Sequence, residues 1–468
     1  MAVAAMGASS LFAADYYVAS NGKDSNPGTQ SAPFGSPEMA LMCAKAGETT
    51  NVYLEKDATF MVGSLRIEDN CNVNIIGDNS TLKAAEKSHL EGGEGLRILR
   101  IGAGTDVEIS GVNFVNGRQV GYFPGGGIFH VGKRLVVDNC SFIDNMGSSN
   151  GGGIASRGHY LEVRNSYFSG NNVEGGGGTG AGISMCGNVD AENFGTLVVD
   201  NCTFYDNHID EGGGHATAIS IFDANSGVSI TGKASVTNCT FLDNTNRQAY
   251  VADVDFSDNG ECEVVFVNNT MVNSEVGLNF YFQEAPVYMF NNFIFASKTA
   301  VASTLSIADS DRTAITAANN VLIGGENPLN ENIDDPMFKG NGNTLGKAAD
   351  NSLASFAMSS TLTREGNIGF LAIGPSSKLA EAGLTTSEQY TPGMNLIPDA
   401  DCRGYKAAGA KCIGAYQPAL SGINDAAVSA DSNAPVEYFN MQGMRVANPE
   451  AGVHIMRQGR TIKKLYIK

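Results

Sequence analysis

Six ionisable side chains follow the strand-like segments of a repeated motif and could perform acid and base chemistry together: His130, Lys133, Arg134, Arg157, His159 and Asp223. An imidazole or a cationic side chain can take a proton from a sugar ring, usually beside a calcium ion, whereas hydrolysis of a glycosidic bond requires paired carboxylates. If successive copies of the motif stack, these residues form a ridge with steps of about 5 Å. The candidate catalytic residues are therefore Arg157, His159, His130 and Asp223.

The same residues are also typical of a surface without catalysis. No two of them place the same ionisable type in the same slot of the motif, and solvent-facing turns normally carry scattered charges. A ridge of this kind could hold a glycan chain without cleaving it. Binding is therefore the preferred interpretation, and catalysis is the alternative.

Calcium is the cofactor for which the sequence offers ligands, although none of them is certain. The segment "DVDFSDNGE" brings Asp253, Asp255 and Asp258 together with the carboxylate density of a calcium loop, but Gly260 does not stand where an EF-hand needs its glycine. A second series shares one slot of the motif and is interrupted by a glycine, which favours turns over a calcium column. This series is Asp144, Gly170, Asp206 and Asp243.

The motif that would position these residues recurs along the middle of the chain. Its copies read "LVVDNCSFIDN" from Leu135, "LEVRNSYFSGN" from Leu161, "LVVDNCTFYDN" from Leu197 and "ASVTNCTFLDN" from Ala234, and a weaker copy, "VEISGVNFVNG", begins at Val107. Repeats of about 20 to 50 residues are typical of solenoids. The period-2 alternation of apolar residues predicts a strand, and the F-x-x-N that follows predicts a turn. We therefore predict an all-β chain folded as a right-handed, single-stranded parallel β-helix.

Like residues should stack on like in such a fold, because equivalent positions of successive coils lie about 4.8 Å apart. We expect the phenylalanines to form an aromatic stack, the first asparagine of each motif to form an internal amide ladder, and the cysteines to form a column of small core residues. Glycine runs before Ile128, Ile154 and Ile183 predict positive φ where the chain enters a strand. The three series are Phe114, Phe142, Phe168, Phe204 and Phe241; Asn139, Asn165, Asn201 and Asn238; and Cys140, Ser166, Cys202 and Cys239.

Composition narrows the range of partners. The 468 residues include 30 Lys or Arg and 49 Asp or Glu, for a net charge of -19, which repels phosphate backbones, so nucleic acid is not expected as a partner. The nine cysteines show no spacing typical of zinc sites. Cys402 and Cys412, on either side of a glycine-containing loop, are the best candidates for a disulfide, although spacing alone does not establish the required geometry.

Two motifs resemble those of known surface proteins. The paired G-G-[GA]-I and F-x-x-N signatures are similar to those of the polymorphic outer membrane proteins of chlamydiae, whose passengers are β-helices. The segment "YYVASNGKDSNPGTQSAPFGSPEMALMCAKAG" from Tyr16 resembles the N-terminal part of pectate-lyase-like β-helix proteins, where it leads into a capping helix. Here Ser36 and Pro37 predict the start of that helix, and Ala40 and Leu41 predict its apolar side.

The closing segment also resembles that of surface β-helix proteins. "DDPMF" at Asp334, "IGPSSKLAEAG" at Ile373 and "DADCRG" at Asp399, followed by "CIGAYQ", fit such a pattern, with Ser for a Pro and Cys402 for a Gly. Residues 15–417 are therefore assigned to one β-helix with caps at both ends. Pectate-lyase-like folds host polysaccharide lyases and glycoside hydrolases, and the fold alone does not choose between them.

The two ends of the chain point to export. Residues 1–14 resemble the apolar region and cleavage site of a signal peptide, without the basic segment that usually precedes them; a buried strand is the alternative. No later segment has the roughly 20 apolar residues of a membrane helix. Residues 418–435 are small and polar, as in a linker.

Residues 436–468 are predicted to form a small β-sandwich. This segment carries six Lys or Arg and two Glu, and it alternates apolar and polar residues around short turns. It is similar to the C-terminal sorting domains of the type IX secretion system, with His454 in place of the usual Tyr. A small binding or packing module is the alternative.

These observations together predict an exported protein, secreted or held at the outer-membrane cell surface of a Gram-negative bacterium. We expect it to be adhesin-like or glycan-binding. Its partners would be a polysaccharide or a host or cell-surface ligand, and the type IX secretion machinery. The alternative is a secreted polysaccharide lyase or glycoside hydrolase on the same scaffold.

Overall fold

The chain forms two compact units, Met1–Pro418 and Ala419–Lys468. The computed structural model describes residues 13–85, 96–119, 121, 123–174, 178–186, 195–209, 217–222, 233–244, 247–251, 263–280, 286–303, 315–333, 338, 340–406, 411–418, 436–439, 445–446, 452–458 and 461–467. Within these ranges no helix is long and apolar enough to cross a membrane. Most of the segment predicted as a signal peptide lies outside them.

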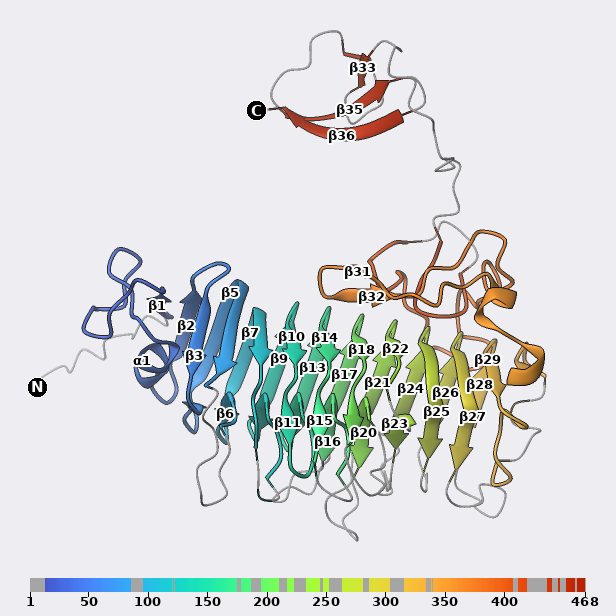
Figure 1. Cartoon of the computed structure of the whole chain (residues 1–468), viewed down its shortest axis with the longest axis horizontal. Coiled ribbons are helices and arrows are strands. Elements are labelled where there is room, and N and C mark those ends of the chain that lie inside the picture. Colours follow the sequence, from blue (N-terminus) through green and yellow to red (C-terminus); the bar gives the residue numbers. More distant parts are fainter. Residues whose placement is uncertain are drawn as a thin grey trace, which may run out of the picture. The chain divides into compact units, whose positions relative to one another are not determined.

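The first unit is a parallel β-helix with three faces (Figure 1). Face 1 contains β1 (Ala14–Val18), β2 (Thr49–Leu54), β9 (Arg134–Asp138), β13 (Tyr160–Arg164), β17 (Thr196–Asp200), β21 (Lys233–Thr237), β24 (Glu263–Val267), β26 (Val287–Phe290) and β28 (Ile315–Ala318). Face 2 contains β3 (Thr59–Val62), β10 (Ser141–Ile143), β14 (Tyr167–Ser169), β18 (Thr203–Tyr205), β22 (Thr240–Leu242), β29 (Val321–Gly324) and β30 (Thr344–Lys347). Face 3 contains β4 (Leu65–Ile67), β6 (Leu99–Ile101), β8 (Ile128–His130), β12 (Ile154–Ser156), β16 (Ile183–Cys186), β20 (Ile219–Phe222) and β23 (Arg247–Val251).

Longer strands join neighbouring faces. β5 (Asn72–Ala84) and β7 (Asp106–Val115) run from face 1 onto face 2, and β25 (Thr270–Phe280) and β27 (Phe293–Ser303) run from face 2 onto face 3. A narrow sheet of β11 (Met146–Gly147), β15 (Asn172–Val173) and β19 (His208–Ile209) lies between faces 2 and 3 in the middle coils. Every pairing among these strands is parallel, which confirms the predicted parallel β-helix.

The repeat supplies the core because its alternation matches the strand period. In β13, Leu161 and Val163 point inward and are fully buried, whereas Glu162 between them is partly exposed. Leu161 pairs with Leu135 of the preceding coil and with Leu197 of the following one. A residue kept in register with its counterparts therefore buries its side chain against two similar ones.

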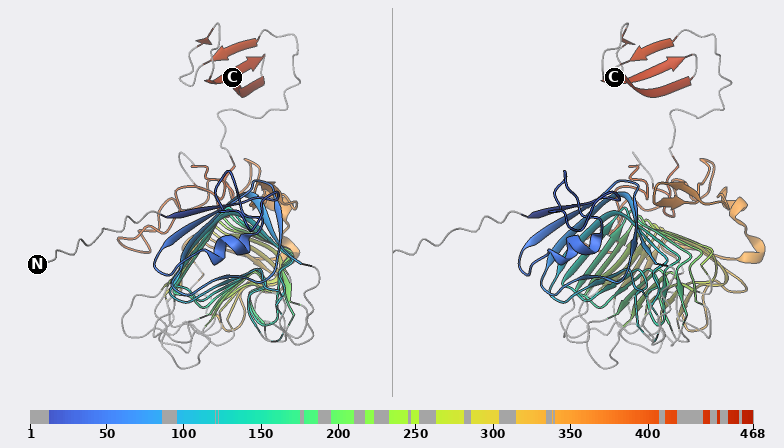
Figure 2. Two further views of the ribbon diagram at one scale, coloured as in Figure 1. Left: turned by 90° about the vertical axis from the view of Figure 1, so that its left-hand side faces the viewer. Right: turned by 60° about the vertical axis from the view of Figure 1, so that its left-hand side comes forward.

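The predicted capping helix is α1 (Pro37–Met42), which lies across the first coil (Figure 2). Ser36 is its N-cap, and its Oγ accepts a hydrogen bond from Met39 N at 3.3 Å. Pro37 begins the helix, where a missing N–H is tolerated. Ala40 and Leu41 are buried against the open end of the core. The cap thus covers apolar side chains that would otherwise face solvent.

The aromatic stack is confirmed. The rings from Phe114 to Phe241 lie on face 2 with centroids 4.7 to 4.9 Å apart and interplanar angles of 3 to 11°. All of them are fully buried. The ring separation equals the spacing of parallel strands, so the backbone register alone brings the rings into contact.

The amide ladder was assigned to the wrong asparagine. The inward column is the second Asn of each motif, the F-x-x-N residue, and its members Asn145, Asn171, Asn207 and Asn244 are fully buried. The Nδ2 of each of the first three donates to the Oδ1 of the next at 3.1, 2.9 and 2.8 Å. The first Asn instead adopts positive φ, 54° at Asn201, and turns the chain between faces 1 and 2. Within the predicted series, the described residues show one amide contact, from Asn201 Nδ2 to Asn165 Oδ1 at 3.4 Å.

A second ladder occupies the cysteine slot. Cys140, Cys202 and Cys239 are buried as predicted, and Cys239 N donates to Asn269 Oδ1 at 3.0 Å in the next coil. From that coil onward the slot holds asparagines that continue the column at 2.9 to 3.0 Å: Asn269, Asn292, Asn320 and Asn343. Thiols and amides fill the same slot because both can bond the backbone at this corner.

The glycine runs pack where the chain enters face 3. Gly151 has a φ of 63°, and a side chain at Gly153 would lie 2.6 Å from Gly182 O of the next coil. Only a residue without a side chain fits such a backbone contact. The neighbouring Ile128, Ile154 and Ile183 pair with one another in register, as predicted.

Residues 348–406 and 411–418 fold back over the outer surface of face 2 and cover its later coils (Figure 1). This C-terminal layer includes η2 (Ala348–Asp350), η3 (Leu353–Phe356), β31 (Thr363–Glu365) and β32 (Ile368–Phe370). Its Phe356 and Ile413 share one apolar cluster with Leu242, Val272 and Phe293 of the β-helix. The outward side chains of these coils are apolar because the layer buries them.

The "DADCRG" motif stabilises the end of this layer through an ion pair and a ring contact. Asp401 is 1% exposed, and its Oδ2 accepts from Arg403 Nε at 3.1 Å and Nη2 at 2.8 Å. The guanidinium stacks 4.0 Å from the centroid of the Tyr416 ring. These residues are therefore structural. The predicted disulfide is wrong, since Cys402 within this motif and Cys412 after it are both buried free cysteines.

The second unit contains β33 (Val436–Phe439), β34 (Arg445–Val446), β35 (Gly452–Gln458) and β36 (Thr461–Ile467). These strands form one antiparallel sheet in the order β34-β33-β35-β36. The hairpin of β35 and β36 is the longest pairing, from Gly452 opposite Ile467 to Gln458 opposite Thr461. The alternation of residues 436–468 thus predicted strands correctly, but the described strands form one sheet and not the two packed sheets of the predicted β-sandwich.

Candidate functional site

His130, a member of the predicted catalytic ridge, lies in the core instead. The side chain at the end of β8 is fully buried between Ile101 and Ser156 of the adjacent coils. Its Nδ1 lies 2.9 Å from Ser156 Oγ, and burial lowers the pKa of the imidazole to about 3. The residue is neutral and shielded from any substrate. The expectation that it faces solvent was wrong because Ile128 and His130 share the inward side of one strand.

The cations near β9 are separate from that position. Lys133 is exposed on the preceding turn. Arg134 Nη1 forms ion pairs with Asp106 Oδ1 at 2.9 Å and with Glu108 Oε1 at 2.7 Å, and these carboxylates help to raise the pKa of the guanidinium. Its charge is therefore already balanced on the surface of face 1.

Arg157 and His159 lie on the turn after β12. Arg157 is partly buried, with its guanidinium carbon 6.0 Å from the centroid of the Phe129 ring, while His159 is exposed. Asp223, the remaining catalytic candidate, lies outside the described residues, as do the calcium candidates Asp253, Asp255 and Asp258. The described members of the ridge do not converge on one point.

The turn series is confirmed as a set of turn formers. Asp144, Asp206 and Asp243 have φ of 54, 53 and 56°, and Gly170 takes the same conformation at 63°. Asp and Gly are residues that tolerate this left-handed region. In the described part of the chain, no three His, Cys, Asp or Glu side chains are grouped so that they could hold a metal ion.

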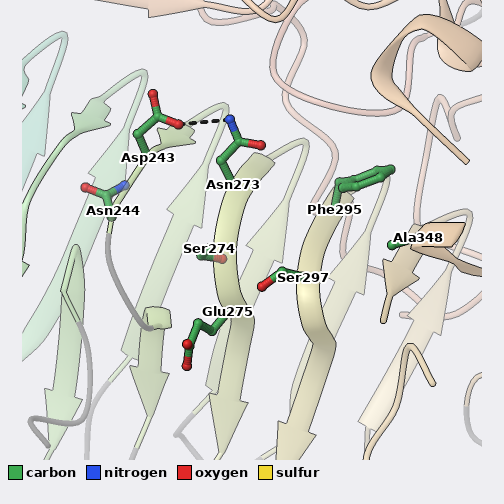
Figure 3. Close-up of a pocket in the computed structure, with 8 residues that line it drawn as sticks. All are labelled: Asp243, Asn244, Asn273, Ser274, Glu275, Phe295, Ser297 and Ala348. Atoms are coloured by element: carbon green, nitrogen blue, oxygen red, sulfur yellow. Dashed lines mark hydrogen bonds between the residues drawn. The ribbon is translucent and has the colours of Figure 1, made fainter. Parts of the chain in front are cut away.

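A groove of about 630 Å³ lies where β25 and β27 bend from face 2 to face 3, and we name it the corner groove (Figure 3). It is lined by Asp243, Asn244, Asn273, Ser274, Glu275, Phe295, Ser297 and Ala348. In the middle coils the short strands β11, β15 and β19 lie at this corner. Here the two strands continue through it, with register shifts around Ser274.

Polar groups and one aromatic ring make up the lining. Asn273 Nδ2 donates to Asp243 Oδ1 at 2.9 Å across neighbouring coils, as Figure 3 shows. Phe295 is partly exposed, and its ring stands at the side of the groove toward the C-terminal layer. Glu275 forms an ion pair with Lys298 Nζ at 2.8 Å. The charge of Glu275 is thus balanced, and Asp243 already accepts an amide hydrogen.

The groove continues toward the next coil. A second hollow of about 670 Å³ shares Ser297 with it and is lined by Ser297, Lys298, Thr299, Gly325, Glu326, Asn327, Leu329, Asn330, Glu331 and Ala349. In η2, Ala348 borders the first hollow and Ala349 borders the second. Together they offer an elongated, open surface with amides, hydroxyls and carboxylates along its length.

Such a surface can bind a chain of hydroxyl-bearing units. Amide and hydroxyl groups donate and accept hydrogen bonds, and the partly exposed face of Phe295 offers apolar contact to the C–H groups of a sugar ring. Equivalent side chains of successive coils repeat about every 4.8 Å. The arrangement provides contacts for binding and orientation.

The sequence-based search missed Asn273, Phe295 and Ser297 because its alignment ended at Asn244. The motif continues in altered form as "NNT" at Asn268 and "NNF" at Asn291, where two successive asparagines take the turn and cysteine slots. Extending the register would have placed Phe295 on the outward side of face 2. The bend that opens the groove has no signature in the motif.

Comparisons with known proteins find likeness to solved β-helix structures. No protein-family model matches the chain, and no curated protein matches it. Among solved structures, the pectate lyase Pel9A has a TM-score of 0.41 at 16% sequence identity, and the match covers 86% of this chain and 96% of the Pel9A chain. The structure described as the complex of XylC with xylose gives 0.40 at 12%, covering 86% and 98%. A rhamnogalacturonan lyase gives 0.32 at 14%, covering 82% and 99%.

Proposed function

We propose that this protein is an exported, adhesin-like β-helix that binds a neutral glycan chain through the corner groove. The observation that carries the proposal is the groove itself, in which the Phe295 ring, the Asn273 amide and the Ser297 hydroxyl line one open surface. A shallow groove with hydrogen-bonding side chains and an aromatic wall suits a ligand that is both hydroxylated and apolar on its ring faces.

The charges of the groove favour a neutral ligand. Lys298, which lines the second hollow, is paired with Glu275 of the first, and Glu326 of the second hollow is 3.6 Å from Lys347. Asp243 and Glu331 add negative charge, and the whole chain carries a net charge of -19. A polyanionic glycan would be repelled here, whereas a neutral one would not.

Calorimetric titration of the purified full-length protein with a panel of neutral oligosaccharides tests the proposal. We expect binding by at least one of them and a loss of about tenfold or more in affinity in Phe295→Ala. Phe123→Ala is the matched control, because Phe123 is 49% exposed and lies far from the groove in the sequence. No binding by the wild type, or equal effects of both substitutions, would contradict the proposal.

Assays for reaction products, run on the same oligosaccharides, distinguish binding from cleavage. A lyase would produce unsaturated uronate absorbance, and a hydrolase would produce new reducing ends. We expect neither product from the panel or from polygalacturonate and alginate incubated with calcium. Either product, if abolished in Arg157→Ala, would replace the binding proposal with an enzymatic one.

Export through the type IX secretion machinery is the second part of the proposal. The supporting observations are the separate second unit, its basic composition and its sorting-domain pattern. In a bacterium that has this machinery, deletion of Val436–Lys468 should leave the protein in the periplasm and leave the melting temperature of the β-helix unchanged. Normal export of the truncated protein would refute the assignment.

A further inference from the structure

A second groove lies at the other end of face 2, where the C-terminal layer stops. We name it the hairpin groove, because the turn between β31 and β32 forms one of its walls. It has a volume of about 500 Å³ and is lined by Asp78, Asn79, Thr81, Gly111, Asn113, Val115, Asn139, Ser141, Ile143, Arg364, Gly366 and Asn367. It spans three successive coils of the β-helix.

The floor of the hairpin groove is a chain of hydrogen bonds that runs from coil to coil. Ser141 Oγ donates to Asn113 Oδ1 at 2.6 Å, and Asn113 Nδ2 donates to Asn79 Oδ1 at 3.1 Å. Val115 and Ile143 lie beside them and are partly exposed. The floor thus combines fixed polar groups with an apolar strip, which suits a sugar ring lying across the coils.

The wall contributes a cation that is held in place and has no carboxylate partner among the described residues. The Arg364 guanidinium carbon lies 3.6 Å from the centroid of the Tyr167 ring, and Nη2 donates to Gly366 O at 3.1 Å. Arg364 is exposed, and no ion pair involves it in the described part of the chain. The one carboxylate of the groove, Asp78, is already paired with Lys56 Nζ at 2.9 Å.

The hairpin that carries Arg364 is fixed to the β-helix through its turn and through β32. Asn367 Nδ2 donates to Asn139 Oδ1 at 3.1 Å, and Gly369 exchanges two hydrogen bonds with Thr203. Gly366 has a φ of 62°, which allows a tight two-residue turn. The position of the guanidinium over the groove is therefore set before any ligand binds, which lowers the entropy lost on binding.

We propose that the hairpin groove binds an acidic sugar unit whose carboxylate pairs with Arg364 and whose hydroxyls bond Asn139, Asn113 and Ser141. A planar guanidinium can hold a carboxylate through two parallel hydrogen bonds. The whole chain carries a net charge of -19 and repels anions in general, so a carboxylate is retained only where an unpaired cation is presented to it. This site is distinct from the corner groove and takes a different class of ligand.

The test compares galacturonate and glucuronate trisaccharides with their methyl esters, which keep the ring and remove the charge. Wild-type protein should bind an acid form, should bind the ester more weakly, and should lose affinity with added salt. Arg364→Gln should weaken binding of the acid about tenfold or more, which corresponds to about 1.4 kcal/mol. Arg364→Lys should weaken it less, because the charge remains while the planar contact is lost.

Arg66→Gln is the matched control, since Arg66 is an exposed arginine of face 3 and its removal changes the net charge equally. The inference is overturned if wild type binds no acid form, if Arg364→Gln binds it as wild type does, or if Arg66→Gln weakens it to the same extent. Binding of neutral glycans by Arg364→Gln is measured in parallel and should be unchanged. This measurement separates failure of the hairpin groove from failure of the corner groove. Unchanged melting temperatures establish that the variants are folded.

Discussion

Thr203 and Gly369 exchange two hydrogen bonds although 166 residues separate them in the chain. Gly369 N donates to Thr203 Oγ1 at 2.6 Å, and Thr203 Oγ1 donates to Gly369 O at 3.2 Å. A side chain at Gly369 would lie 2.7 Å from Thr203 Cγ2. This contact joins β18 of the β-helix to β32 of the C-terminal layer, and it sets the position of the hairpin that carries Arg364.

Replacement of Thr203 by Val should destabilise the protein by about 1 to 3 kcal/mol, because it leaves the buried Gly369 N–H without a partner. The denaturant midpoint would report this loss, and binding of acidic trisaccharides should weaken with it. Thr240→Val is the control, since Thr240 occupies the same slot one coil later and its buried Oγ1 has no hydrogen-bond partner in the described part of the chain. Equal destabilisation by the two substitutions would contradict the assigned contact.

The corrected amide ladder predicts unequal effects at two asparagines of one motif. Asn207→Ala should cost about 3 kcal/mol or more, because it removes the acceptor of Asn171 Nδ2 and the side-chain donor to Phe168 O and Asn244 Oδ1 in the core. Asn201→Gly should cost about 1 kcal/mol or less, since glycine accepts the positive φ at that turn. Denaturant titrations of both variants measure the difference. A larger loss in Asn201→Gly would restore the original assignment.

Burial of His130 predicts acid sensitivity. Its pKa is about 3 in the folded protein, against an ordinary value of 6.5, because burial and the nearby His159 disfavour the charged form. The unfolded chain therefore binds the extra proton, so stability is complete above about pH 6.5 and falls as the pH drops toward 3, by roughly 4 to 5 kcal/mol at most. His130→Ile should lose this part of the pH dependence. Unfolding curves at pH 7 and pH 4 that shift equally in both proteins would refute it.

Free thiols at Cys402 and Cys412 predict a specific labelling pattern. Burial raises the pKa of both thiols, so iodoacetamide should modify neither in the folded protein. Unfolding without reductant should make both reactive, and each should then gain one carbamidomethyl group by mass spectrometry. Labelling of the pair that requires reductant would establish a disulfide instead.

Local sequence patterns were sufficient to predict the coil. Stacked positions such as Phe142, Phe168 and Phe204 repeat with the strand alternation, and a parallel register brings like residues together whatever the rest of the chain does. The capping helix followed from Ser36 and Pro37 for the same local reason. Periodicity did not say which asparagine points inward, since Asn201 and Asn207 both border a turn and only the backbone φ separates them.

The positions of the two grooves depend on contacts between distant parts of the chain. The corner groove depends on a bend through β25 and β27 that carries no motif. The hairpin groove depends on the C-terminal layer, whose Arg364 packs on Tyr167, a residue distant in sequence. His130 was placed on a surface because its type suggested chemistry, whereas its strand side placed it in the core. Local patterns encode strand direction and stacking, but the contacts that cover or leave open an outer surface come from residues distant in sequence.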